Sequence, residues 1–331
     1  MIRAGIIGGA GYTAGELIRL LLLHPEVELS FVCSESSAGK LLSEVHEGIY
    51  GDTDLRFCEM PDLVGLDVLF MCSAHGASSA FWESHSRPEG LKVIDLAQDR
   101  RDGSCGYVYG LPECNAAAIR GAGSVANPGC FATAIQLALL PLAAAGLLRS
   151  AVEVTAVTGA TGAGARPGAT THFSWRSGNI SAYKIFTHQH LPEILRTLSR
   201  LCHSDLCHSE RSEESPFPEI HFIPLRGDFA RGIFAAVHTE CPLAEAAVRR
   251  LYEDYYADAP FTFVAPGPVD LKQVTGTNKC LLQLEKHGSR LVVCSVIDNL
   301  LKGASGQAVE NMNLMFGLPE DMGLHLKATA Y

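Results

Sequence analysis

The sequence has no run of basic residues, and no apolar stretch reaches the ~20 residues that a membrane-spanning helix needs. Acidic side chains outnumber basic ones, with 36 Asp and Glu against 26 Lys and Arg and a formal net charge of −10. This balance argues against nucleic acids and membranes as partners and favours small molecules. Because the pattern of a secretory signal peptide is also missing, we expect a cytoplasmic protein.

Cysteine pairs spaced as C-x-x-C are missing as well, although the chain contains 11 cysteines. An odd number of scattered cysteines is typical of reduced thiols rather than of a disulfide framework. The spacing predicts no structural zinc site, and we expect no metal. With 331 residues, of which 47% are hydrophobic and 19% charged, the chain has the composition of a globular protein with room for two domains.

The first part of the chain is typical of a Rossmann-type α/β domain with a doubly wound parallel sheet. Short apolar runs that predict parallel strands lie at residues 2–7, 27–33, 68–72, 92–96 and 124–126. Helical apolar spacing follows the first run, at residues 14–23. The chain is therefore expected to open as a strand, a turn and a helix.

A glycine-rich turn separates this first strand from the helix. Its residues are Gly8, Gly9, Ala10, Gly11, Tyr12, Thr13 and Ala14. From Gly9 onward they match the form G-x-G-x-x-A of the dinucleotide fingerprint, in the context of strand and helix that it requires. Glycines there let a pyrophosphate approach the main chain at the helix N-terminus. We predict a dinucleotide site; the alternative is a tight turn without a ligand.

The end of the second strand is where the ribose of a dinucleotide would lie. Glu35 could accept hydrogen bonds from the 2′-hydroxyl of NAD. Ser34, Ser37 and Lys40 could instead hold the 2′-phosphate of NADP. The residues alone leave both coenzymes open.

Cys130 is a candidate nucleophile because of its place in the sequence. It follows Pro128 and Gly129, which cannot continue a preceding helix, and it precedes apolar residues at helical spacing. A helix should therefore begin at or beside Cys130, where unpaired N–H groups and the helix dipole would stabilise a thiolate. The alternative is that Cys130 is a small buried apolar residue.

Two imidazoles and a carboxylate lie close together at His188, His190 and Glu193. A helix starting near residue 192 would put His190 and Glu193 on one face, and the cluster could move a proton near neutral pH. A nicotinamide domain followed by a thiolate narrows the chemistry to redox reactions of aldehydes or acyl groups. Arg231, which precedes a glycine, is a candidate anion clamp.

The later part of the chain predicts a second, α+β domain with a largely antiparallel sheet. Alternating strands are expected at residues 152–158, 219–224, 233–240, 280–285 and 291–297, with a hairpin at 286–290. Residues 303–316 are again helical and could return to the first domain. We therefore expect a cofactor domain of residues 1–128 and 303–331 and a catalytic domain of residues 129–302.

A polar insertion at about 202–215 has cysteine and histidine pairs but is interpreted as a surface loop.

Seven short motifs in this order resemble those of the N-acetyl-γ-glutamyl-phosphate reductase family over nearly the whole chain. They lie at residues 8–17, 38–40, 109–113, 127–133, 187–194, 231–233 and 298–308. The resemblance implies a semialdehyde dehydrogenase-like fold and NADPH-dependent reduction of an acyl phosphate to N-acetylglutamate 5-semialdehyde in arginine biosynthesis. It also implies a dimer or tetramer that is assembled through the second domain.

The resemblance carries roles to individual residues. The nucleophile falls on Cys130, the paired histidines on His188 and His190, and the nicotinamide-side asparagine on Asn299; we favour His190 as the acid/base. Substrate contacts are then expected at Asn127, Glu193 and Arg231. The catalytic sequence would be attack by Cys130, loss of phosphate, hydride transfer to the thioester and collapse of the thiohemiacetal.

The chain departs from the family pattern at three places. Glu35 stands where an arginine is usual, so that NAD is also possible as the coenzyme. Residues 96–101 lack the usual serine, and Leu225 and Arg226 replace a histidine and a small residue. The insertion at 202–215 is the third departure.

Two other functions are compatible with these patterns. The first is a related reductase that acts on aspartyl phosphate or on a carrier-bound aminoadipyl or glutamyl phosphate. The second is a dinucleotide-binding regulatory protein without catalysis, in which Cys130 would be a structural or redox-sensing thiol.

Overall fold

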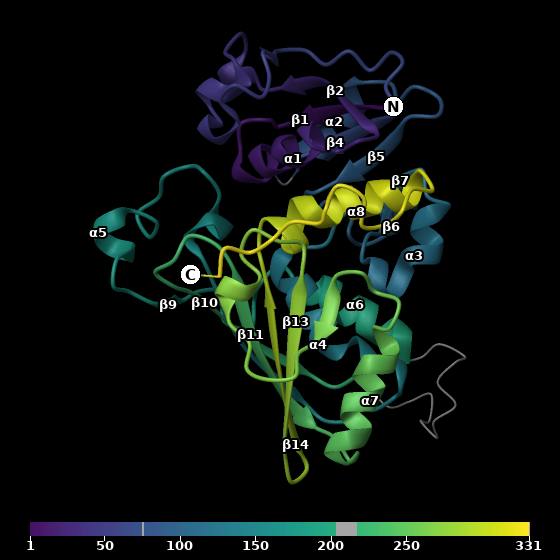
Figure 1. Ribbon diagram of the computed structural model, residues 1–331, viewed down its shortest axis with the longest axis vertical. Helices are drawn as coiled ribbons and strands as arrows, with labels where there is room; N and C mark the ends of the chain where they lie inside the picture. Colours follow the sequence, from purple (N-terminus) through teal and green to yellow (C-terminus); the bar gives the residue numbers. More distant parts are fainter. Residues whose placement is uncertain (75, 203–216, 331) are drawn as a thin grey trace. The chain divides into compact units, whose positions relative to one another are not determined.

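The computed structural model describes residues 1–74, 76–202 and 217–330, and its contacts divide the chain into two units (Figure 1). Unit 1 comprises Met1–Gly129 and Ala304–His325, and unit 2 comprises Cys130–Gly303 and Leu326–Tyr331. The expected cofactor domain ran on to residue 331, whereas the last residues group with unit 2. Apart from Cys202, the polar insertion predicted at 202–215 lies outside the described residues.

Unit 1 contains a seven-stranded sheet in which every pairing is parallel. Its strands are β1 (Ile2–Ile7), β2 (Val27–Cys33), β3 (Phe57–Cys58), β4 (Val68–Met71), β5 (Lys92–Asp95), β6 (Val108–Tyr109) and β7 (Ser124–Ala126). The order is β3-β2-β1-β4-β5-β7-β6, so the winding reverses between β1 and β4. The predicted doubly wound sheet is confirmed, and ligands bind such sheets at the carboxyl ends of the strands beside this reversal.

Helices cover the unit 1 sheet because its short strands are apolar on both faces. Leu69 and Met71 of β4 pack against Phe81 and Trp82 of α2 (Ala77–Ser84). Val68 and Phe70 alternate with them and are fully buried as well. Helix α8 (Gly306–Met315) packs against two further helices of this unit, α1 (Tyr12–Leu22) and α3 (Pro112–Arg120). Helix α8 belongs to the segment that was predicted to be helical and to return to the first domain, and its contacts group it with unit 1.

Unit 2 contains a second seven-stranded sheet, of order β12-β13-β14-β11-β8-β10-β9. Its strands are β8 (Val152–Thr158), β9 (Ser181–Ala182), β10 (Ile220–Arg226), β11 (Ile233–Glu240), β12 (Thr262–Val264), β13 (Cys280–His287) and β14 (Arg290–Ile297). Only β8 with β10 and β12 with β13 pair in parallel, which confirms the largely antiparallel sheet. The predicted hairpin turns at Gly288, whose φ of 57° suits a residue without a side chain.

Helix α4 (Cys130–Ala144) is the core of unit 2 and begins at the cysteine, as the sequence predicted. It is buried along nearly its whole length and packs against β11, β14 and α6 (Leu191–Cys202). Helix α7 (Glu245–Tyr255) is fixed to it through the hydroxyl of Tyr252, which donates to the carbonyl of Ala138 at 2.6 Å. The fourth helix, α5 (Phe173–Arg176), is a single turn.

The remaining elements are short. The 3-10 helices span Glu35–Ser37, Leu42–Glu44, Glu47–Ile49, Ser104–Gly106, Ala160–Ala163 and Leu271–Gln273. A π-helical turn, Leu301–Ser305, precedes α8, so the helix predicted from residue 303 begins as a wider turn. None of the helices in the described part of the chain is long and apolar enough to cross a membrane.

Candidate active site

The glycine-rich turn of unit 1 leaves an open space in front of α1, and side chains at its glycines would clash or occupy that space. Gly8 has a φ of +79°, and a Cβ there would lie 2.8 Å from the main chain of Cys72. A Cβ on Gly9 would lie 2.2 Å from Cγ1 of Val32. Gly11 caps α1 without a side-chain hydrogen bond, and nothing lies within 4 Å of where its Cβ would be. The space before the first N–H groups of α1, from Tyr12 through Ala14, is therefore open, as a pyrophosphate requires.

His46 supports this turn, although no sequence pattern predicted that it would. Its Nε2 lies 2.7 Å from the carbonyl oxygen of Gly9. Its ring packs so closely on Gly15 that a Cβ there would lie 2.6 Å from Nδ1. From the C-terminal return, the hydroxyl of Ser305 donates to the carbonyl of Thr13 at 2.7 Å. The conformation of the turn is thus fixed from two sides.

The residues predicted to meet the ribose lie at the carboxyl end of β2. Ser34 and Ser37 are buried, and the main-chain N–H of Ser37 donates to the carbonyl of Ser34. Glu35 and Lys40 are exposed. The exposed carboxylate and the exposed ammonium group lie near two serine hydroxyls, and this arrangement suits either coenzyme. NAD and NADP are therefore both still predicted.

Asn127 is buried and directly follows β7, at the start of the loop that leads to α4. Its Nδ2 donates to the carbonyl of Ala304 at 3.0 Å, and its Oδ1 accepts from Nδ2 of Asn311 at 3.0 Å. Its own carbonyl accepts from Nε of Arg101 at 2.9 Å. The side chain predicted to contact substrate is therefore engaged within unit 1, where it ties the C-terminal return to the sheet.

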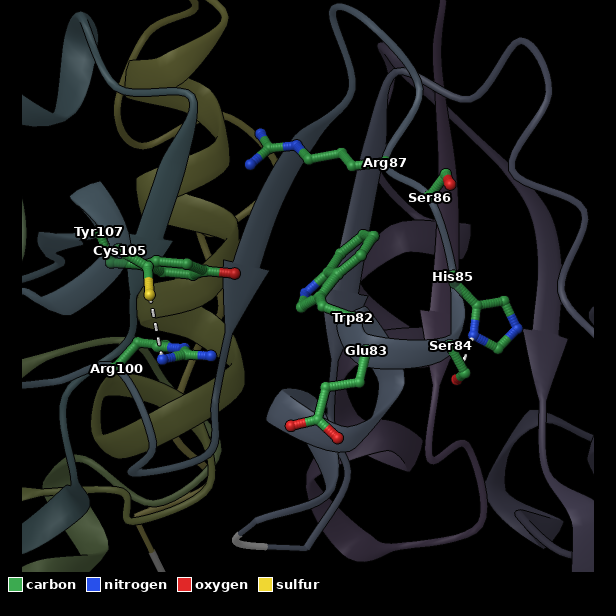
Figure 2. Close-up of a pocket in the computed structure, with 9 residues that line it drawn as sticks. All are labelled: Trp82, Glu83, Ser84, His85, Ser86, Arg87, Arg100, Cys105 and Tyr107. Atoms are coloured by element: carbon green, nitrogen blue, oxygen red, sulfur yellow. Dashed lines mark hydrogen bonds between the residues drawn. The ribbon is translucent and has the colours of Figure 1, made fainter.

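Unit 1 also has a hollow of about 600 Å³ whose wall comes from the end of α2 and from the segment before β6 (Figure 2). Trp82, Arg87, Arg100 and Tyr107 line it, and Arg100 donates to Sγ of Cys105 at 3.2 Å. The guanidinium of Arg87 is taken up by main-chain carbonyls and by a serine hydroxyl. None of the residues predicted for cofactor or catalysis lines this hollow.

In unit 2, the chemistry-bearing residues gather at the start of α4. Cys130 is the first residue of the helix and is partly exposed. Gly303 lies directly against it, because a Cβ at position 303 would lie 2.8 Å from the Cβ of Cys130. A side chain at residue 303 would therefore displace the cysteine.

Phe131 joins Cys130 to the two histidines. Its ring centroid lies 5.4 Å from that of His188 and 6.4 Å from that of His190, in edge-to-face geometry. The imidazoles themselves are 4.6 Å apart, and Nε2 of His190 lies 3.9 Å from Oε1 of Glu193. All three polar side chains are buried. The predicted site residues Cys130, His188, His190 and Glu193 therefore lie near one another. As predicted, a helix that starts near residue 192 positions the last two, because α6 begins at Leu191.

The two histidines have different surroundings. Burial, with the positive charges of Lys184 and Arg226, lowers the pKa of His188 to about 4. Its Nδ1 accepts a hydrogen bond from the main-chain N–H of His190 at 3.2 Å, which places the proton of the neutral ring on Nε2. His190 instead faces a carboxylate, with which it would form an ion pair when protonated. Of the two imidazoles, only His190 therefore lies beside a carboxylate in the described part of the chain.

Tyr183 and Arg226 complete the cluster and were not among the predicted site residues. The Tyr183 ring lies 5.8 Å from that of His188, and the guanidinium carbon of Arg226 lies 4.5 Å from the centre of the Tyr183 ring. Burial raises the pKa of Tyr183 to about 12, so its hydroxyl stays protonated at neutral pH. The two residues lie close together because β9 pairs with β10. No local sequence pattern predicts this pairing.

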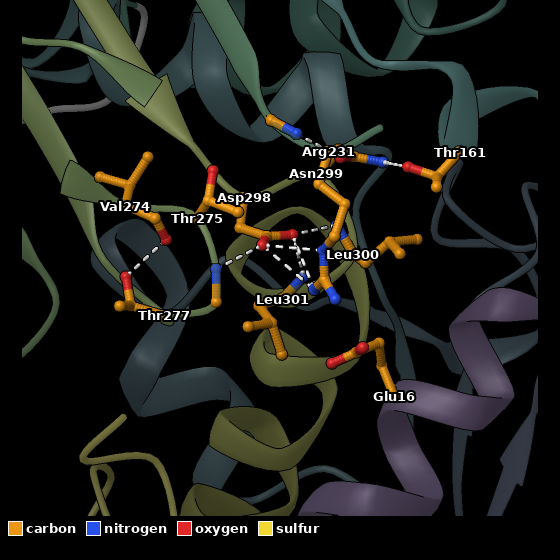
Figure 3. Close-up of polar contacts among 12 residues, drawn as sticks. Glu16, Thr161, Arg231, Val274, Thr275, Thr277, Asp298, Asn299, Leu300 and Leu301 are labelled. Carbon is orange, nitrogen blue, oxygen red and sulfur yellow. Dashed lines mark hydrogen bonds and ion pairs between the residues drawn. The ribbon is translucent and has the colours of Figure 1, made fainter. Parts of the chain in front are cut away.

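Asp298 is the hub of a second polar cluster in unit 2 (Figure 3). Its fully buried carboxylate accepts from Nε and Nη2 of Arg231 at 3.1 Å each, and from the main-chain N–H groups of Gly276 and Leu300 at 2.8 Å. Asn299 follows it: its Oδ1 accepts from the N–H of Gly232 at 2.7 Å. The predicted cofactor contact Asn299 and the predicted anion clamp Arg231 are therefore held by one network.

The predicted site residues thus form two groups, one in each unit. Unit 1 holds residues 8–14, Ser34, Ser37 and Asn127, and unit 2 holds the cysteine, the histidines, Glu193, Arg231 and Asn299. Across the described part of the chain, no three His, Cys, Asp or Glu side chains are grouped so that they could hold a metal ion.

Comparison with known families matches both units. Residues 3–122 match the model of the semialdehyde dehydrogenase NAD binding domain, and residues 130–299 match that of the semialdehyde dehydrogenase dimerisation domain. Among solved structures, aspartate semialdehyde dehydrogenase II from Vibrio cholerae, complexed with ASA, superposes with a TM-score of 0.72. The alignment covers 96% of this chain and 98% of that one at 19% identity, so it shows the shared fold.

Full-length relatives are much more similar. The N-acetyl-gamma-glutamyl-phosphate reductase of Bacteroides thetaiotaomicron is 57% identical over 100% of both chains. That of Christiangramia forsetii is 53% identical over 99% of both chains. The chain belongs to the N-acetyl-gamma-glutamyl-phosphate reductase family of semialdehyde dehydrogenases.

Proposed function

We propose that this protein catalyses the NADPH-dependent reduction of N-acetyl-γ-glutamyl phosphate to N-acetylglutamate 5-semialdehyde and phosphate, through a thioester on Cys130. The observation that carries the proposal is the group of a helix-terminal cysteine, two unlike histidines and a carboxylate in unit 2. The relative that is 57% identical over the full length of both chains is named as this reductase, which supports the proposal.

The cofactor proposal fits the residues of unit 1. The open space at Gly11 and the uncapped start of α1 suit a pyrophosphate, and Ser34, Ser37 and Asn299 are proposed as further contacts. NADPH supplies the hydride when it is bound. Glu35 makes NAD the alternative coenzyme.

Cys130 is proposed as the nucleophile. Its thiolate attacks the acyl carbon, the carbon–oxygen bond to phosphate breaks, and phosphate leaves with the bonding electron pair. The N–H groups at the start of α4 would stabilise the oxyanion of each tetrahedral species, at about 3 kcal/mol per donor. After hydride addition, the carbon–sulfur bond of the thiohemiacetal breaks and the thiolate is restored.

His190 is proposed as the acid/base, because Glu193 stabilises its protonated form while His188 stays neutral. It would take up the proton of the Cys130 thiol and return a proton to oxygen later in the cycle. His188 then orients the pair, since its Nδ1 fixes the main chain of His190. Asn127, Glu193 and Arg231 stay the predicted substrate contacts.

A homo-oligomer, either a dimer or a tetramer, is proposed to form through unit 2. The match to a dimerisation domain supports this. Unit 2 also exposes large apolar side chains between residues 173 and 186, namely Phe173, Trp175, Ile180, Ile185 and Phe186. Clustered exposed apolar side chains of this size are typical of interfaces.

The test is the reverse reaction, because it avoids the unstable acyl phosphate. The purified protein is given N-acetylglutamate semialdehyde, phosphate and either NADP or NAD, next to Cys130→Ser. Reduction of coenzyme that requires both phosphate and Cys130 is the expected result, and the coenzyme ratio decides between NADP and NAD. Turnover of aspartate semialdehyde alone would instead assign a related reductase, and coenzyme binding without any turnover would assign a regulatory protein.

A further inference from the structure

Arg226 lies on the same face of β10 as residues that line the histidine cluster. Side chains alternate along a strand, so Phe222, Pro224 and Arg226 point to one side. The ring of Phe222 lies 5.2 Å from that of Phe131 and 5.4 Å from that of His188. The Arg226 side chain is therefore directed toward the site and not toward the opposite face of the sheet.

The Nε–H of Arg226 is buried and has no hydrogen-bond partner among the described residues. An unpaired buried donor costs free energy, and in native structures such a group is usually met by water or by a ligand. Asp228 is the nearest carboxylate along the chain, but its Oδ2 accepts from the main-chain N–H of Gly178 at 2.5 Å. Among the described residues, no ion pair joins Asp228 to Arg226, whose guanidinium carbon lies 4.5 Å from the centre of the Tyr183 ring.

Two other arginines of unit 2, Arg231 and Arg176, use their side-chain donors within the protein. Arg231 donates to Asp298 through Nε and Nη2. Arg176 donates to the carbonyl of Thr170, to the hydroxyl of Ser181 and to the carbonyl of Arg226 itself. Arg176 therefore fixes the main chain of Arg226. The buried Nε–H of Arg226 itself stays available to donate a hydrogen bond to a ligand.

We propose that Arg226 binds the carboxylate of the substrate that is remote from the reacting carbonyl, and so selects acyl substrates that carry this acid. This assignment rests on the proposed function. The reacting carbon must lie at Cys130. Arg226 lies next to the ring of Tyr183, which contacts that of His188, and His188 in turn packs against Phe131 beside Cys130. A guanidinium with an unpaired N–H suits a carboxylate, through short charge-assisted hydrogen bonds. The effect of its charge on the pKa of His188 agrees with this placement.

The experiment compares two aldehydes in the phosphate-dependent reverse reaction. N-acetylglutamate semialdehyde carries the acid, and 4-acetamidobutanal is the same molecule without it. Wild type, Arg226→Gln and Arg226→Lys are assayed for kcat/KM with each aldehyde and for the KM of phosphate. Arg249→Gln is the matched control, because Arg249 pairs with Glu253 on the surface of α7.

We expect Arg226→Gln to lower kcat/KM about 100-fold for the acid-bearing aldehyde and by a much smaller factor for 4-acetamidobutanal. Arg226→Lys should recover part of the loss, since it keeps the charge without the planar donor pair. If Arg226→Gln does not fold, the smaller selective loss in Arg226→Lys carries the same comparison. The KM of phosphate should stay the same in all variants.

Equal losses with both aldehydes would overturn the assignment and make Arg226 a residue that positions the reacting groups. A raised KM for phosphate would overturn it as well and assign the arginine to the leaving group. The proposed function is tested separately by the wild type: if the wild type turns over the semialdehyde while Arg226→Gln treats both aldehydes alike, only the Arg226 assignment fails.

Discussion

The candidate site of unit 1 consists largely of main-chain groups, whereas that of unit 2 consists of side chains. In unit 1 the predicted coenzyme contacts include the main-chain amides at Gly8 to Gly11, where added side chains would clash or fill the open space. In unit 2 the predicted reacting groups are the side chains of Cys130, His188 and His190, which strands and helices bring together. A main-chain site should therefore be sensitive to added volume, whereas a side-chain site should be sensitive to lost partners and to protonation.

The largest effect that would sharpen this contrast is expected at Asp298. Asp298→Ala should lower the free energy of unfolding of unit 2 by about 3–5 kcal/mol, because it leaves the charge of Arg231 without its buried partner. Calorimetry of the variant measures the loss. Asp270→Ala is the control: Asp270 is exposed and caps only the short helix Leu271–Gln273, where about 1 kcal/mol is expected. Equal losses at the two sites would contradict the role of Asp298 as a hub.

A pair of glycine variants tests the main-chain site. Gly9→Ala should cost about 1–3 kcal/mol of stability and abolish coenzyme binding, because its Cβ would overlap Val32. Gly11→Ala meets no protein atom and should leave the melting temperature nearly unchanged, while it weakens coenzyme binding at least about tenfold. Calorimetry and fluorescence titration separate the two quantities. Unchanged binding in Gly11→Ala would show that the open space does not face the coenzyme.

Protonation should affect unit 2 through His188. Its pKa is about 4 in the folded protein against 6.5 for the free side chain, so the unfolded chain takes up the proton first as the pH falls. The stability that neutral His188 provides is complete above pH 6.5 and is lost toward pH 4. Between pH 7 and pH 5 the loss amounts to about 2 kcal/mol. Denaturant unfolding at both values should show a smaller loss in His188→Gln, and an identical pH dependence would exclude this origin.

The smallest effect is expected at the rim of unit 1. Glu35→Ser removes an exposed carboxylate next to Ser34 and should raise the preference for NADP over NAD about tenfold. The measurement is the ratio of kcat/KM for the two coenzymes. Glu28→Ser makes the same charge change on the exposed side of β2 and should leave the ratio unaltered. A shift of equal size in both variants would mean that only net charge matters.

The sequence predicted those features that depend on neighbours in the chain. The strand, turn and helix around Gly9 follow from local spacing, and so does the start of α4 at Cys130. The doubly wound sheet follows from repeated short apolar runs. Two or three residues carry no clear period: β3, β6, β9 and β12 were not predicted, although the equally short β7 was.

The missing parts of the candidate sites are contacts between distant segments. Tyr183 and Arg226 meet only because β9 pairs with β10, and His46 reaches the turn from 37 residues away. Arg231 was recognised as an anion-binding side chain, but sequence spacing could not reveal that Asp298, 67 residues later, would occupy two of its donors. Spacing identifies which groups are available, and tertiary contacts decide how many of their hydrogen bonds are already used.

The close contact between Gly303 and Cys130 restricts which residues position 303 can accept. A Cβ there would lie 2.8 Å from the Cβ of Cys130, so any residue other than glycine would have to shift the first turn of α4. As such a chain diverges, the residue at position 303 is therefore tied to the position of a thiol that lies far away in the sequence.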